Sequence, residues 1–228
     1  MRFTGIAILL AVCSCFSCRD TTPPTTAGLP ANAVGRIVFD GNSLLATEYG
    51  EPAWPDLVIQ ALAAPKVSSA NIGVGGQTTA DMLRDVDTQT QPLFATGEPD
   101  IYIAWEVTND LFFGASADSA YARIVRLGRD QRAKGWRVIV MTPMPRGNAS
   151  HPEDWEARRQ SVLLRMRANW RSFADELVDI AADPVLGSYA SLDDKRYFRD
   201  RVHLGPDGTK LVAQLVTPAV ERQLMRQR

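Results

Sequence analysis

Short apolar runs alternate with longer segments of helical periodicity from residue 35 to the end of the chain. The runs have the length and the β-branched content of buried strands. They lie at 36–39, 66–72, 101–105, 137–142 and 176–180. Five strands that alternate with helices predict an α/β fold, in which helices cover both faces of a parallel five-stranded sheet.

The segments between these runs place apolar residues on one face of a helix. The three clearest faces consist of Trp54, Leu57, Val58, Ala61 and Leu62; of Tyr121, Ile124, Val125 and Gly128; and of Val162, Met166, Trp170 and Phe173. The last helix is expected to begin at the sequence GPDG, where Pro206 suits a first turn. Pro218 lies inside this helix, and we expect a kink or a break there.

The first 34 residues differ in composition from the rest. An apolar run at 3–12 precedes three cysteines and is shorter than the roughly 20 residues that span a bilayer. It predicts an export signal at 1–18. The cysteines resemble those of a bacterial lipoprotein signal, with Cys15 or Cys18 as the lipidation candidate because each follows a serine; an ordinary cleaved signal is the alternative. The Thr- and Pro-rich segment 19–34 predicts a disordered tether ahead of one domain at 35–228.

These features predict an exported bacterial protein that is periplasmic or held at a membrane by an N-terminal lipid. The formal net charge of −1 gives no reason to expect a nucleic acid partner. The predicted domain has no cysteine, which excludes disulfides, thiol catalysis and cysteine-ligated metal from it. The chain has two histidines, and neither has companions at metal-ligand spacing, so no metal is expected. His151 is expected to be a loop residue without a catalytic role.

Glycine and polar residues gather where the predicted strands end, which is where ligands bind in parallel α/β sheets. In FDGNSLL, Ser43 is either a nucleophile or a helix cap. The glycines of NIGVGGQTT let the backbone approach a ligand, or merely form a turn. In WEVTNDL, Asn109 can donate a hydrogen bond into a site while Asp110 holds the loop, or both belong to an ordinary turn. Near the C-terminus, Asp200 and His203 stand three residues apart.

Together these segments resemble the four sequence blocks of the SGNH (GDSL) hydrolases, and they read here as GNSL, NIGVGGQT, VTND and DRVH. The resemblance covers essentially residues 35–228. It implies a three-layer, flavodoxin-like fold and a serine esterase that needs no cofactor. By this resemblance Ser43 is the nucleophile, His203 the general base and Asp200 the group that orients it. The backbone N–H groups of Ser43 and Gly76 and the side-chain amide of Asn109 would hold the oxyanion.

Two residues depart from the family pattern. Asn42 replaces an aspartate before the nucleophile, and we expect the amide to keep its supporting hydrogen bonds while the charge is lost. Val107 replaces a glycine, and a β-branched residue does not readily adopt positive φ. By position alone, Trp105, Glu106 and Arg146 are expected to shape the substrate cleft.

The predicted substrate is a small-molecule or glycan ester. The sequence contains no long amphipathic segment that would form a lipase lid, which favours short acyl or acetyl esters. An acyltransferase would use the same residues. A non-catalytic polysaccharide-binding module on this fold is the alternative from another class, although its expected signature is the loss of the serine, the histidine or the asparagine.

Overall fold

The structure is a computed structural model that describes residues 35–45, 52–62, 67–95, 99–147 and 151–226. Its strands form one parallel sheet in the order β2-β1-β3-β4-β5. They are β1 (Gly35–Gly41), β2 (Val67–Asn71), β3 (Asp100–Trp105), β4 (Arg137–Met141) and β5 (Glu176–Val178). Each overlaps one of the five predicted runs, so the predicted α/β class is confirmed.

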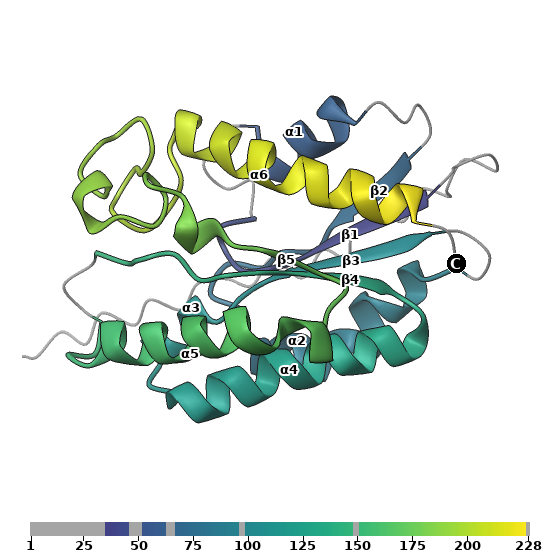
Figure 1. The fold of residues 1–228 in the computed structure, drawn as a ribbon, viewed down its shortest axis with the longest axis horizontal. Helices are drawn as coiled ribbons and strands as arrows, with labels where there is room; N and C mark the ends of the chain where they lie inside the picture. The colour runs from purple at the N-terminus through teal and green to yellow at the C-terminus, as the bar shows by residue number, and fades with distance from the viewer. Residues whose placement is uncertain (1–34, 46–51, 63–66, 96–98, 148–150, 227–228) are drawn as a thin grey trace, which may run out of the picture.

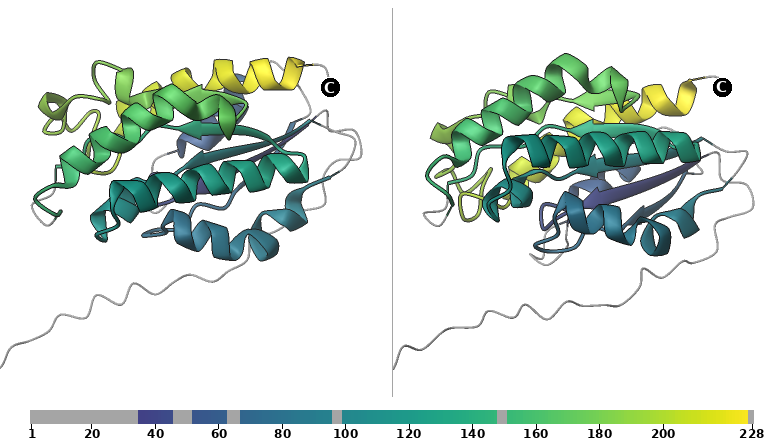
Figure 2. Two further views of the ribbon diagram at one scale, coloured as in Figure 1. Left: turned by 60° about the horizontal axis from the view of Figure 1, so that its bottom comes forward. Right: turned by 90° about the horizontal axis from the view of Figure 1, so that it is seen from below.

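Helices cover both faces of the sheet (Figure 1). One face carries α1 (Trp54–Ala61) and α6 (Pro206–Met225). The other carries α2 (Thr79–Gln89), α4 (Ala117–Lys134) and α5 (Trp155–Asn169), with the short α3 (Thr108–Phe112) at one end (Figure 2). The described residues also form four single 3-10 turns, at Gln91–Leu93, Trp170–Ser172, Ile180–Ala182 and Tyr189–Ser191. The three-layer architecture is therefore as predicted.

Side chains that alternate along the strands build two cores. On β3, Ile101, Ile103 and Trp105 join the cluster beneath α1 and α6, whereas Tyr102 and Ala104 join the cluster beneath α2, α4 and α5. A strand that is buried on both faces reads as a largely apolar run, because a buried polar side chain is costly unless it is hydrogen-bonded. All six residues of β3 are buried.

The central strands bring distant segments together at their carboxyl ends. Gly41 at the end of β1 pairs with Trp105 at the end of β3, so the segments that follow both strands start side by side. The loop after β2 joins them, since the N–H of Val74 donates to the carbonyl of Gly41 at 3.0 Å. A Cβ at Gly41 would lie 2.5 Å from the carbonyl oxygen of Trp105, so this close approach requires glycine.

The helix α6 begins at Pro206 as predicted, but it does not break at Pro218. A proline inside a helix removes one backbone hydrogen bond and adds a steric clash. Here Val216, Ala219 and Val220 are fully buried against the sheet on both sides of Pro218, and this packing keeps the helix continuous to Met225. Of the two expectations for Pro218, the break is therefore wrong, and the kink stays a prediction.

The predicted signal at 1–18, with Cys15 and Cys18, and the predicted tether at 19–34 lie outside the described residues. They remain predictions, as do the domain boundaries. Among the helices that the structure describes, none combines the length and the apolar character that a membrane crossing requires. The same residues contain no group of three or more His, Cys, Asp or Glu side chains that could hold a metal ion.

Candidate active site

Ser43 lies in a tight turn directly after β1. The N–H of Leu45 donates to the carbonyl of Asn42 at 3.0 Å and closes the turn. The side-chain oxygen of Asn42 accepts the N–H of Leu44 at 2.8 Å and so braces the turn from within. Residues 43–45 form a turn and not the first turn of a helix, so Ser43 is not a helix cap.

His203 and Asp200 meet Ser43 across the sheet edge. Ser43 Oγ lies 2.9 Å from His203 Nε2, and His203 Nδ1 lies 2.6 Å from Asp200 Oδ2. Because a carboxylate only accepts hydrogen bonds, Nδ1 carries the hydrogen and Nε2 turns its lone pair toward the hydroxyl. The three predicted residues thus form one continuous hydrogen-bonded chain.

The loop that carries this pair is shaped by Asp200 itself. Its Oδ1 accepts the N–H groups of Val202 at 3.0 Å and His203 at 2.7 Å, while Arg201 takes a left-handed φ of 69° between them. Partial burial acts to raise the pKa of the Asp200 carboxyl, but the hydrogen bonds from His203 and Val202 outweigh it. The pKa therefore falls below its usual value, and the carboxylate is the stable form.

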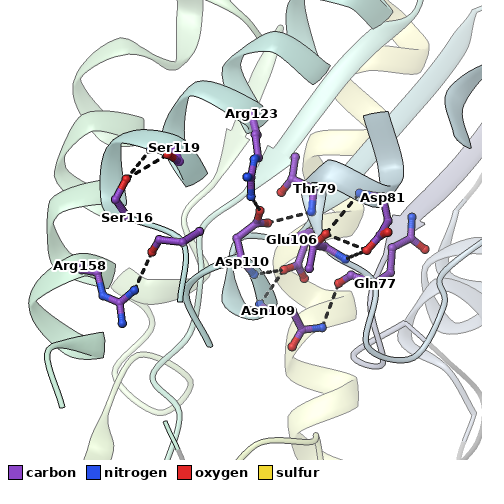
Figure 3. Close-up of polar contacts among 12 residues, drawn as sticks. Gln77, Thr79, Asp81, Glu106, Asn109, Asp110, Ser116, Ser119, Arg123 and Arg158 are labelled. Atoms are coloured by element: carbon purple, nitrogen blue, oxygen red, sulfur yellow. Dashed lines mark hydrogen bonds and ion pairs between the residues drawn. The ribbon is translucent and has the colours of Figure 1, made fainter. Parts of the chain in front are cut away.

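Asn109 lies in the first turn of α3, with its amide held at both ends. Its Nδ2 donates to the carbonyl of Gln77 at 3.0 Å (Figure 3), and its Oδ1 accepts from Arg146 Nη1 at 3.2 Å. The amide orientation is therefore fixed, and Nδ2 has a second hydrogen for a ligand.

Val107 stands where the family pattern has a glycine, but the backbone here does not require one. Its φ of 163° is extended backbone that any residue adopts.

Gly76 occupies the turn that leads from β2 to α2. The N–H of Gln77 donates to the carbonyl of Val74 at 3.0 Å, and Gly76 has a left-handed φ of 75° inside this turn. A Cβ at Gly76 would meet no atom within 4 Å, so the space beside it is open. The structure places Gly76 next to Gln77, whose carbonyl binds Asn109, and Thr78 then caps α2 with a capping box.

Asp110 holds the loop, as the sequence predicted. Its Oδ2 accepts the N–H of Thr79 at 2.8 Å, and its Oδ1 accepts from Arg123 Nη1 at 2.8 Å (Figure 3). Asp110 therefore connects α3 to the start of α2 and to α4. These bonds fix the helical turn that presents Asn109.

Two of the three residues expected to shape the cleft do not do so. Trp105 is 1% exposed and packs in the core beneath α1 and α6, where its indole N–H donates to the carbonyl of Thr142 at 3.1 Å. Glu106 is 2% exposed. Burial raises its pKa to about 8, and the charge of Asp110 adds to this rise, while hydrogen bonds from Asn42, Asn109 and Asp110 oppose it.

Arg146 does line the small pocket beside Ser43. Its guanidinium lies 3.9 Å from the centre of the Phe112 ring, and burial lowers its pKa. The described lining consists of Asn42, Ser43, Leu44, Thr108, Asn109, Met144, Pro145, Arg146 and Val202. Sequence reasoning did not single out Leu44, Thr108, Met144, Pro145 and Val202, because no motif or spacing assigns these residues a role.

His151 takes no part in this arrangement. Its ring stacks on Trp155, with centroids 5.6 Å apart, and its Nδ1 lies 3.0 Å from the carbonyl of Pro152. These contacts agree with the predicted role as a loop residue.

A hydroxyl bonded to an imidazole, an imidazole bonded to a carboxylate, and amide donors at the same sheet edge are the groups that acyl transfer to a serine requires. Fold and site together are those expected of a carboxylic ester hydrolase. The family described as the GDSL-like lipase/acylhydrolase family matches residues 26–211. The chain belongs to this family, and its activity is that of a carboxylic ester hydrolase. No curated protein sequence matches the chain.

Solved structures share the fold at low sequence identity. A putative acylhydrolase from Bacteroides fragilis is 21% identical with a TM-score of 0.69, over 86% of this chain and 90% of its own. A lipolytic protein of the G-D-S-L family from Veillonella parvula is 17% identical with a TM-score of 0.68, over 82% and 99%. An acetyl xylan esterase is 17% identical with a TM-score of 0.65, over 81% and 99%. At these identities the comparisons establish the fold.

Proposed function

We propose that the protein hydrolyses short-chain carboxylic esters through an acyl-enzyme on Ser43. The observation that carries this proposal is the chain of two short contacts, 2.9 Å from Ser43 Oγ to His203 Nε2 and 2.6 Å from His203 Nδ1 to Asp200. A serine hydroxyl is a weak nucleophile on its own, and an adjacent base that is held in the correct tautomer activates it.

In the first half of the reaction, Ser43 Oγ attacks the ester carbonyl while His203 Nε2 takes the hydroxyl proton. The tetrahedral intermediate then collapses, and the alcohol leaves with that proton. In the second half, His203 removes a proton from water, the resulting hydroxide attacks the acyl-enzyme, and the proton returns to Ser43 as the acid departs. Asp200 stays ionised throughout and stabilises the imidazolium.

The oxyanion of each tetrahedral intermediate needs donors that are already in place. We assign this role to the backbone N–H groups of Ser43 and Gly76 and to Nδ2 of Asn109. Support for Asn109 comes from its fixed amide, which is bonded to Gln77 and Arg146. Support for Gly76 comes from its left-handed turn and the open space beside it.

The size of the pocket favours a short acyl group. Within the described lining, which includes Met144 and Pro145, the pocket beside Ser43 is a cavity of only about 10 Å³. That is about the room that one water needs, and an acetyl methyl group is of similar size. One of the solved structures with this fold is an acetyl xylan esterase, which supports an acetyl ester of a glycan as one kind of substrate.

An acyltransferase would use the same three residues, and it would be recognised by a product in which an alcohol, instead of water, has received the acyl group.

We also propose that the protein is exported and carries a lipid on Cys15 or Cys18. Labelling with a radioactive fatty acid in cells tests this proposal, because label should disappear when the modified cysteine is replaced by alanine.

The test of the proposed activity is hydrolysis of p-nitrophenyl acetate, butyrate and octanoate by the purified protein, compared with Ser43→Ala and His203→Ala. We expect turnover of the acetate to exceed that of the octanoate, and each substitution to abolish it while the protein stays folded. Wild-type turnover equal to that of Ser43→Ala on all three esters would refute the proposal.

A further inference from the structure

Glu106 is a buried carboxyl group that the reaction steps above do not use. It follows β3 directly and is 2% exposed. Its Oε1 accepts the N–H of Asn109 at 2.6 Å and the N–H of Asp110 at 3.2 Å (Figure 3). Its Oε2 accepts a hydrogen bond from Nδ2 of Asn42. Both oxygens are therefore bonded, and every one of these three partners is a donor.

These partners belong to the turns after β1 and β3, whose relative position must be fixed for the reaction. Asn42 immediately precedes Ser43, and its Oδ1 accepts the N–H of Leu44 at 2.8 Å, so its amide spans the nucleophile. Asn109 carries the side-chain donor, and its own backbone N–H is one of the groups that Glu106 binds. A single carboxyl group thus connects the turn after β1 to the turn after β3.

We propose that Glu106 is a positioning residue for ester hydrolysis, which fixes Ser43 relative to Asn109 by bonding Asn42 on one side and the backbone of residues 109 and 110 on the other. This inference rests on the proposed function. Glu106 acts through its neighbours, since it is buried behind Asn42 and does not line the pocket. Preorganised donors lose much of their effect when they are displaced, because the developing charge is then poorly solvated.

The bonding pattern makes the identities of residues 42 and 106 depend on each other. In Glu106→Gln, the introduced oxygen can still accept from Asn109 and Asp110, but the introduced NH₂ group then faces the NH₂ group of Asn42. Asn42 cannot turn its amide, because its oxygen is held by the N–H of Leu44. In Asn42→Asp, a second carboxyl group faces Glu106. Glu106→Gln therefore replaces a hydrogen bond with two opposed NH₂ groups, whereas Asn42→Asp brings together two carboxyl groups, which share a proton because the pKa of Glu106 is already raised.

The exchange of both residues restores every bond. With Asn42→Asp and Glu106→Gln together, an introduced carboxylate faces an introduced NH₂ group. An acceptor remains for the N–H of Leu44, and another remains for the N–H groups of Asn109 and Asp110. A matched control is Asp100→Asn, which converts a carboxyl group that is 1% exposed at the opposite end of β3, where it accepts the N–H of Ala95 at 3.1 Å.

The experiment compares kcat and KM for p-nitrophenyl acetate in the wild type, both single variants, the exchange variant and Asp100→Asn, with rates expressed per folded molecule. We expect kcat to fall at least tenfold in Glu106→Gln while KM changes less than threefold. Asn42→Asp should lose less, because a shared proton preserves a bond between residues 42 and 106. The exchange variant should recover to within threefold of the wild-type kcat, and Asp100→Asn should have the wild-type kcat. A Glu106→Gln variant with wild-type kcat, or an exchange variant no better than Glu106→Gln, would overturn the inference.

Amide hydrogen exchange gives a reading that does not depend on activity. The N–H groups of Asn109 and Asp110 should exchange faster in Glu106→Gln and regain protection in the exchange variant. If the wild type shows no hydrolysis, the proposed function fails, and this measurement still decides whether Glu106 holds the two turns. If the single variants do not fold, the exchange variant alone tests the inference. An exchange variant that fails to fold and to hydrolyse the ester contradicts it.

Discussion

Replacement of Asp200 by asparagine should abolish most of the activity while the loop that carries His203 stays in place. The introduced oxygen can still accept the N–H groups of Val202 and His203, which Asp200 Oδ1 now accepts at 3.0 and 2.7 Å. The introduced NH₂ group, however, would face His203 Nδ1 across the present 2.6 Å contact. Nδ1 must then accept, so the hydrogen moves to Nε2, and the imidazole cannot take the proton of Ser43.

The size of the loss follows from this change of tautomer. In a serine protease with the same three groups, the corresponding change lowers kcat about 10⁴-fold, which corresponds to about 5 kcal/mol of transition-state stabilisation. The free energy of unfolding should change by less than about 1 kcal/mol, because the polar contacts of a half-exposed side chain contribute little to stability and the Asp200 side chain is 51% exposed.

The assay is turnover of p-nitrophenyl acetate per folded molecule, with urea denaturation as the measure of stability. Asp207→Asn is the matched control, since Asp207 lies in the first turn of α6 and pairs with Lys210 at 3.1 Å. Its kcat should equal that of the wild type. If Asp200→Asn keeps more than a tenth of the wild-type kcat in a folded protein, the account of how His203 is oriented is refuted.

Two further predictions concern buried polar groups. Asn109→Ala should lower kcat by roughly 10²–10³ with little change in KM, because it removes one oxyanion donor; an unchanged kcat in the ester assay would exclude that role. Asp40 is 2% exposed and accepts from Tyr102 at 2.5 Å, and burial raises its pKa from 3.8 to about 7. The folded protein therefore holds this proton more tightly than the unfolded chain, so stability is lost as the pH rises from 3.8 to 7, by up to about 4 kcal/mol. In urea denaturation between pH 4 and 8, Asp40→Asn should reduce this decline, and a decline as steep as that of the wild type would contradict the assignment.

The fold was predictable because the central strands β1, β3 and β4 are buried on both faces and therefore read as apolar runs. The helix α6 was predictable up to Pro218, where the expected break is absent because Val216, Ala219 and Val220 pack on the sheet. A local rule for proline does not include that packing. Trp105 was misplaced for a related reason, since its position near a strand end suggested a cleft, whereas alternation along β3 directs it into the core.

The candidate triad was predictable because Ser43, Asp200 and His203 lie in segments that resemble family blocks. Glu106 was not, since its role depends on partners that no local pattern connects. Two of its bonds go to backbone N–H groups, and the third goes to Asn42, 64 residues earlier in the chain. The sequence showed the departure at Asn42, but only the fold shows that the amide there faces a carboxyl group.

The most direct test of the central claim is covalent labelling of the purified protein with a fluorophosphonate, followed by mass spectrometry of its peptides. Attack by an activated serine on phosphorus expels fluoride and leaves a stable phosphonyl ester. The account predicts a single adduct on Ser43, which is absent from Ser43→Ala and strongly reduced in His203→Ala. An unlabelled wild-type protein, or an adduct on another residue that survives Ser43→Ala, would contradict it.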